Sequence, residues 1–145
     1  MAFPPVKSVR SVRDNETLRV GDLAVTAHFT PGHTPGSTTW TWRSCEGADC
    51  VDVVYADSLN AVSDDDFKFT SRLGLVEAFR GSIARVSALK CDVLLSVHPR
   101  FSERDRDQAR RRTSPSPFLN AQACRQYAEE ASKRLDARIA SEKAR

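Results

Sequence analysis

The sequence predicts an α/β fold in which helices cover a sheet. Short strand-like runs dominate the first half of the chain, where Gly, Pro and Asp separate them. Helical spacing of apolar residues appears only in the second half, around one further strand. The 145 residues are enough for one compact domain of this kind.

Four segments in the first half have the composition of strands. Leu18–Val20 and Leu23–His28 are apolar runs on either side of a Gly-Asp turn. Ser37–Arg43 alternates Trp with Thr, which is typical of a strand, and Val51–Tyr55 is apolar. A short turn-forming stretch separates the last two segments, so they are expected to form a hairpin.

A long loop, a helix and a further strand follow. Asp57–Thr70 is polar and acidic, which predicts a loop. Apolar residues recur at spacings of three and four in Leu75–Leu89, which predicts a helix with one buried face. Val93–Val97 is a short apolar run that ends before His-Pro, and it predicts a buried strand.

Two more helices are expected in the last third of the chain. Ser102–Arg112 is polar and has Ser102 as a possible cap. Asn120 is expected to cap a last helix that runs to about Lys143. Few apolar residues remain beyond Lys133, so the end of this helix is expected to fray.

The charge distribution argues against a nucleic-acid partner. The net charge is +3, and the segment from Arg100 to the end carries 12 Lys and Arg against 7 Asp and Glu. Basic and acidic residues alternate in Ser102–Asp107, which is typical of a solvated helix face, because a nucleic-acid surface needs one uncompensated sign. No run of about 18 apolar residues occurs, so no membrane partner is expected.

Four cysteines without a Cys-x-x-Cys pair favour disulfides over a zinc clasp. Cys45 and Cys50 enclose a turn-forming stretch, which suits a local disulfide across the predicted hairpin. Two disulfides would indicate an oxidising compartment, although Met1–Val6 shows no secretory signal. Four free thiols in a cytosolic chain are the alternative on composition alone.

Two of the three histidines stand at the ends of predicted strands. Pro and Gly flank His33 on both sides, which fixes the path of the backbone and suits a rigidly held imidazole. His98 follows the buried strand, where α/β folds place their ligands, and Asp57 and Ser58 follow another strand. Metal ligation by the two histidines is one interpretation. Surface histidines, and an Asx-turn or helix cap at Asp57, are the alternatives.

Three segments carry motifs that occur together in one family. Ala27–Trp42 contains Gly-His-Thr-Pro-Gly-Ser, Tyr55–Leu59 contains Ala-Asp-Ser-Leu, and Cys91–Pro99 contains Ser-Val-His-Pro. In this order they resemble the metallo-β-lactamases of the third subclass of class B, in which the last segment is the final ligand element. The first motif alone would indicate only the wider metallo-hydrolase superfamily. The resemblance extends from about Pro4 to the end of the chain.

The resemblance implies a fold and a zinc site. The fold is the C-terminal half of an αββα four-layer sandwich, so residues 1–145 would form a partial metallo-β-lactamase domain. His33 corresponds to the third histidine of the three-histidine zinc site, and His98 to the last ligand of the second zinc site, in an enzyme that holds two zinc ions. Ser58 and Asn60 stand where the family positions water or substrate, although relatives often have Ser or Thr in place of Asn60.

The resemblance also assigns the remaining histidine and the cysteines. His28 is a structural residue by this comparison. Cys91 and Cys124 match the family's common disulfide, and Cys45 and Cys50 match an extra disulfide found in some members. A periplasmic or secreted protein is therefore expected.

One element of the family does not occur in this sequence. The family's first half carries a His-x-His-x-Asp-His element that supplies four of six protein ligands, and this chain has only three histidines. The chain is therefore expected to be a fragment or a truncated product that needs the missing N-terminal half for a complete site. The expected activity of the whole enzyme is hydrolysis of β-lactam antibiotics by a zinc-bound hydroxide, with the isolated chain inactive. The alternatives are a thioester or lactone hydrolase of the same superfamily, and a non-catalytic remnant domain.

Overall fold

The computed structural model describes residues 4–5, 7–64, 66–98 and 118–144, and in them one sheet is packed against two helices. The strands, in sequence order and also in sheet order, are β1 (Thr17–Val20), β2 (Leu23–Phe29), β3 (Thr38–Glu46), β4 (Asp49–Ala56) and β5 (Val93–Ser96). The helices are the 3-10 helix η1 (Phe69–Ser71), α1 (Leu75–Ala88) and α3 (Ala123–Lys143). The helix predicted over Ser102–Arg112 lies outside the described residues. No described helix has both the length and the apolar character that a membrane crossing needs.

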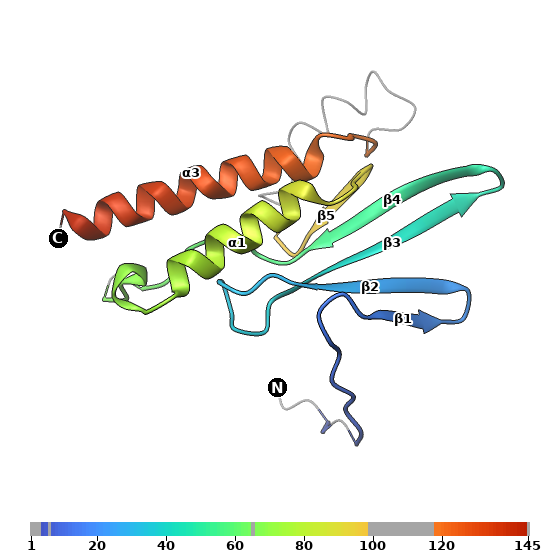
Figure 1. The fold of residues 1–145 in the computed structure, drawn as a ribbon, viewed down its shortest axis with the longest axis horizontal. Helices are drawn as coiled ribbons and strands as arrows, with labels where there is room; N and C mark the ends of the chain where they lie inside the picture. The colour runs from blue at the N-terminus through green and yellow to red at the C-terminus, as the bar shows by residue number, and fades with distance from the viewer. Residues whose placement is uncertain (1–3, 6, 65, 99–117, 145) are drawn as a thin grey trace.

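The strand directions decide where the loops emerge. Successive strands from β1 to β4 pair antiparallel, and β4 pairs parallel with β5. Two antiparallel steps separate β2 from β4, so β2, β4 and β5 run the same way. The segments that follow these three strands therefore leave the sheet at one edge (Figure 1).

The predicted hairpin forms and is longer than its sequence pattern. β3 continues past Arg43 to Glu46, and β4 begins at Asp49. The tight turn between them uses Gly47 at φ 60°, a conformation that glycine adopts at little cost. The cross-strand cysteine pair extends the ladder beyond the alternating Trp-Thr residues.

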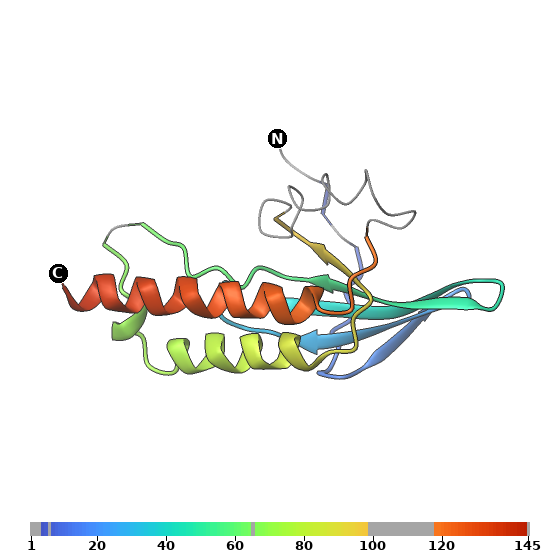
Figure 2. The same cartoon turned by 90° about the horizontal axis from the view of Figure 1, so that it is seen from above.

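The core lies between the sheet and the helices. Helices α1 and α3 lie side by side in both views (Figures 1 and 2), and an ion pair of 2.8 Å joins Arg80 to Asp136 across them. Alternate residues of β4 enter this core because successive side chains of a strand point to opposite faces. The fully buried members of the core include Val54, Ala56, Phe79, Val86 and Leu135.

The opposite face of the sheet is apolar and only partly covered. Trp40 and Trp42 of β3 share this face with Val53 and Tyr55 of β4, which stand directly opposite them. Leu95 of β5 is the register partner of Tyr55, and both side chains remain 40% exposed. A sheet face of this composition normally packs against another layer.

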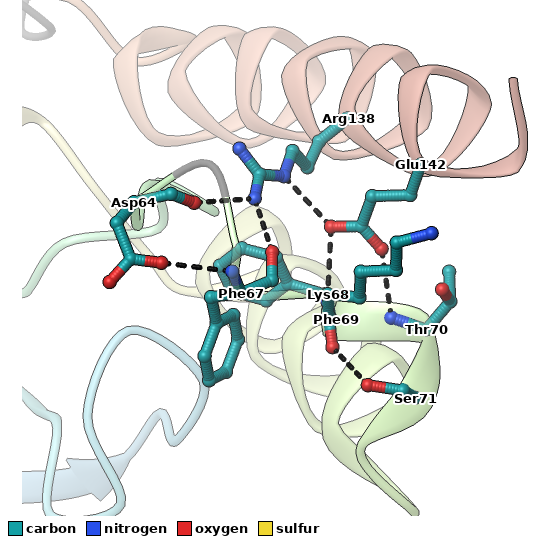
Figure 3. Close-up of polar contacts among 8 residues, drawn as sticks. All are labelled: Asp64, Phe67, Lys68, Phe69, Thr70, Ser71, Arg138 and Glu142. Carbon is teal, nitrogen blue, oxygen red and sulfur yellow. Dashed lines mark hydrogen bonds and ion pairs between the residues drawn. The ribbon is translucent and has the colours of Figure 1, made fainter. Parts of the chain in front are cut away.

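The C-terminal part of α3 is ordered helix, so the expected fraying is wrong. The reason is a partly buried ion pair between Arg138 and Glu142, with a distance of 2.8 Å (Figure 3). The Glu142 carboxylate accepts the main-chain N–H groups of Phe69 and Thr70, each at 3.0 Å. The Arg138 guanidinium donates to the main-chain oxygen of Phe67 at 2.5 Å. Polar groups hold this helix end, and counting apolar residues cannot detect them.

The helix begins slightly later than predicted. Gln122, not Asn120, occupies the N-cap position of α3. Asn120 still shapes the entry, because its side-chain oxygen accepts the N–H of Gln122 at 3.1 Å and its main-chain oxygen accepts the N–H of Ala123 at 2.9 Å. Asn120 therefore belongs to the turn that precedes the helix and does not occupy the N-cap position.

Replacing Glu142 with Gln is expected to lower the free energy of unfolding at pH 7 by about 2–3 kcal/mol. Burial raises the pKa of Glu142, but the hydrogen bonds from Thr70, Arg138 and Phe69 outweigh it and lower the pKa to about 2. Because the folded-state value lies below the ordinary 4.5, this stabilisation is present above about pH 4.5 and is lost as the pH falls towards 2.

Urea denaturation at pH 7 and near pH 2.5 measures this difference. Glu130→Gln is the matched control, since Glu130 makes an exposed ion pair with Lys133 on the same helix and should change stability by less than about 1 kcal/mol. An equal effect of the two substitutions, or a Glu142→Gln effect that grows at low pH, would contradict the assignment.

Candidate metal centre

Residues of α1 hold the loop between β2 and β3 in place. The main-chain oxygen of Pro31 accepts the Ser82 hydroxyl at 2.6 Å. Gly32 has φ 150°, and a Cβ added to it would stand 2.9 Å from the ring of Phe79. The Pro-Gly sequence is therefore required by close approach as well as by the backbone conformation. The position of the following residue, His33, is fixed by this contact.

Gly32→Ala is expected to destabilise the fold by about 1–3 kcal/mol, because it adds both backbone strain and a collision with a buried ring. Gly36→Ala in the same loop is the control, since a Cβ there meets nothing within 4 Å and φ is not in the positive region. Thermal unfolding of the two variants measures the difference. Equal stabilities would show that the contact with Phe79 does not constrain the loop.

The imidazole of His33 is held in one tautomer. Its Nδ1 lies 2.9 Å from the main-chain oxygen of Asn60. A carbonyl oxygen can only accept, so Nδ1 carries the proton and the neutral ring keeps its lone pair on Nε2. Histidines that bind metals commonly have this arrangement, in which a carbonyl fixes one nitrogen and the other faces the metal.

His98 reaches the same place from β5. Its main-chain N–H donates to the Ser96 hydroxyl at 3.2 Å. The ring centroids of His98 and His33 are 5.9 Å apart, with an angle of 83° between the rings. Both side chains are exposed to solvent. The structure thus brings together the two histidines that stand 65 positions apart in the sequence, as their places at strand ends predict.

The segment that follows β4 forms a compact turn next to His33. The Asp57 carboxylate accepts the N–H of Thr38 at 3.1 Å and the N–H of Ser58 at 2.6 Å. The Ser58 hydroxyl accepts the N–H of Asn60 at 3.3 Å. Asp57 therefore ties the end of β4 to the start of β3.

Ser58 and Asn60, the residues expected to position water or substrate, lie inside this turn. They are 1% and 2% exposed. The side-chain oxygen of Asn60 is buried and has no hydrogen-bond partner among the described residues. The contact that Asn60 makes towards the site is its main-chain oxygen on His33. Sequence reasoning missed this contact, because any residue type carries a main-chain carbonyl.

His28 is separate from this pair. Its Nε2 lies 2.9 Å from the Thr41 hydroxyl on the neighbouring strand. Partial burial and the nearby charge of Arg85 lower the pKa of His28. A neutral imidazole that bridges two strands fits the structural role that the resemblance implies.

The residues present fit a zinc ion as part of its ligand set. His33 and His98 offer two imidazoles at one sheet edge, and imidazole is a common zinc ligand. The described residues contain no group of three or more His, Cys, Asp or Glu side chains that could hold a metal ion. A catalytic zinc site normally has three protein ligands and an open position. The described residues therefore do not by themselves make up such a site.

Two disulfides brace the elements around the site. The structure joins Cys91 to Cys124 with a Cα separation of 6.1 Å, and Cys45 to Cys50 with a Cα separation of 4.0 Å. The first bond connects the start of β5 to the start of α3, so His98 lies within the loop that it closes. The second lies at the end of the β3–β4 hairpin. The pairings are those that the resemblance implies, and they are compatible with an oxidising compartment.

Solved metallo-β-lactamases have this architecture, although no protein-family model matches the chain. Rm3 metallo-β-lactamase is similar over 97% of this chain and 54% of its own, with 43% identity and a TM-score of 0.90. MEM-A1, a subclass B3 metallo-β-lactamase from a soil metagenome library, matches over 97% and 55%, with 44% identity and a TM-score of 0.89. Metallo-β-lactamase SMB-1, bound to 2-mercaptoethanesulfonate, matches over 97% and 54%, with 45% identity and a TM-score of 0.88.

These similarities define the class of protein. The five-stranded sheet with its two helices has the metallo-β-lactamase fold, in part. More particularly, the chain resembles the C-terminal half of a subclass B3 metallo-β-lactamase. It spans about half the length of the solved structures that it matches.

Proposed function

We propose that residues 1–145 are the C-terminal part of a zinc-dependent β-lactamase that confers resistance to β-lactam antibiotics. The observation that carries the proposal is the pair His33 and His98, whose rings lie 5.9 Å apart at the edge of the sheet. The main-chain oxygen of Asn60 supports the proposal, because it leaves the Nε2 lone pair of His33 available to a metal.

In the proposed complete enzyme, two zinc ions occupy the site, with His33 on one and His98 on the other. Zinc, when bound, lowers the pKa of a bound water to about 7 and polarises the carbonyl that is attacked. This chain contributes the rigid placement of the two imidazoles. The Pro-Gly loop and the turn after β4 hold His33, and the end of β5 holds His98.

The remaining ligands would come from a polypeptide segment equivalent to the part of the relatives that this chain does not match. The partly covered sheet face, with Trp40, Trp42 and Tyr55, offers that segment an apolar surface. Two disulfides support a periplasmic or secreted location. The proposed substrate is a β-lactam antibiotic, whose amide bond water cleaves.

A chimaera tests this proposal. The segment of Rm3 metallo-β-lactamase that lies outside the match would be joined to residues 1–145, loaded with zinc and assayed with a chromogenic cephalosporin. Turnover is expected, and His33→Ala or His98→Ala should reduce it by about 100-fold or more, because each removes a direct metal ligand. His28→Gln is the matched control and should keep most of the activity.

A folded chimaera that binds two zinc ions but shows no turnover would count against the proposed function. So would turnover that is insensitive to both His33→Ala and His98→Ala. Thermal unfolding of every variant separates loss of a ligand from loss of the fold.

A further inference from the structure

Tyr127 places its hydroxyl at the base of the turn that supports His33. The side chain is 3% exposed and projects from the second turn of α3. The hydroxyl donates to the main-chain oxygen of Asp57 at 3.2 Å and accepts the N–H of Leu59 at 3.4 Å. One phenol therefore uses both its donor and its acceptor on the backbone of a single turn.

This turn leads directly to the site. The N–H of Asn60, the next residue after Leu59, is held by the Ser58 hydroxyl at 3.3 Å. The oxygen of Asn60 accepts the Nδ1 proton of His33 at 2.9 Å. The backbone of the turn thus joins the contacts of the Tyr127 hydroxyl at Asp57 and Leu59 to the contact of Asn60 with the imidazole.

Tyr127 is itself firmly held. It lies three residues after Cys124, and the disulfide to Cys91 ties this end of α3 to the start of β5. Burial raises the pKa of Tyr127, so the phenol stays protonated and keeps its donor. The Ser96 side chain, which acts to lower the pKa of the same phenol, also accepts the N–H of His98.

We propose that Tyr127 is a positioning residue that fixes the Asp57–Asn60 turn and thereby orients the imidazole of His33. This inference depends on the proposed function in one respect, which is that the imidazole is oriented towards a metal. Removing the hydroxyl frees the N–H of Leu59 and the oxygen of Asp57 inside a buried turn. The turn must then shift to find new partners, because buried main-chain groups are rarely left unpaired.

Tyr127→Phe tests the proposal in the metal-free chain. Nitrogen-15 spectra of the imidazoles report which ring nitrogen carries the proton. Wild-type His33 is expected in the Nδ1–H form, and Tyr127→Phe should shift it towards the Nε2–H form. The zinc affinity of the variant should fall about tenfold, the lower range for loss of a group that orients a ligand. Tyr55→Phe, at the only other tyrosine, is the matched control and should leave both readings unchanged.

Circular dichroism and thermal unfolding show whether Tyr127→Phe folds. A folded variant with an unchanged His33 tautomer and unchanged zinc affinity overturns the proposal. If the variant does not fold, Ser58→Ala decides, because it removes a contact of the same turn one step closer to His33. A shifted tautomer in Ser58→Ala supports the proposal, and an unshifted one overturns it. The tautomer reading does not involve zinc, so it stands even if the proposed function fails.

Discussion

Residues 1–145 alone are expected to show no measurable hydrolysis of a chromogenic cephalosporin, with or without added zinc. The expected rate lies about 10⁶-fold or more below that of a complete enzyme, the lower range of enzymatic acceleration. The chain offers one imidazole to each of the two proposed metals, whereas a catalytic zinc site normally has three protein ligands. Each metal would therefore be bound weakly and without a fixed geometry.

Ser58 is not expected to hydrolyse the substrate as a nucleophile in place of a zinc site. Its hydroxyl is buried and accepts the N–H of Asn60. The polar contacts found for Ser58 include no histidine base, which an activated serine needs. Turnover that a chelator abolishes and that disappears in His33→Ala would show that the chain is active as it stands, against this account.

Removing the Cys91–Cys124 disulfide is expected to lower the free energy of unfolding by about 3–4 kcal/mol, because the bond closes a loop of 33 residues in the unfolded chain. The double variant Cys91→Ala with Cys124→Ala makes this change without leaving a free thiol. Removing the Cys45–Cys50 bond, which spans only 5 positions, should cost about 2 kcal/mol in the same model and is the matched control.

Urea denaturation under non-reducing conditions measures both losses. The decisive result is which of the two disulfides, when removed, causes the larger loss in the free energy of unfolding. A larger loss from the Cys45–Cys50 pair would mean that native-state contacts at the hairpin, rather than loop closure, determine what each bond contributes. Zinc affinity provides a second measurement. It should change when the Cys91–Cys124 bond is removed and not when the Cys45–Cys50 bond is removed, because only the first of these two bonds closes the loop that contains His98.

The strands and α1 could be predicted from periodicity because they follow local rules. The alternating Trp-Thr run became β3, and apolar residues three and four apart became α1. The convergence of His33 and His98 was also predictable, since both follow strands and the strand ends share an edge. In these elements, local pattern and tertiary packing agree.

The polar network at the end of α3 could not be predicted. Glu142 is 72 residues away from Thr70, whose N–H it accepts, and nothing in the sequence links the two. The burial of Glu142 is contrary to the usual expectation that charged residues at a helix end are exposed and that such an end frays. The same applies to Tyr127, whose partners are main-chain atoms of a distant turn. Contacts to main-chain groups leave no signature in the residue types that they join.

The central claim is that His33 and His98 belong to one two-metal site, each on its own metal, and that His28 does not. A zinc titration of residues 1–145, followed through the ring signals of the three histidines by NMR, tests it most directly. The signals are assigned from single His→Ala variants. The account predicts that the His33 and His98 rings shift together over the same range of zinc concentration, while His28 stays unchanged. A shift of His33 without His98, or an equal shift of His28, would contradict it.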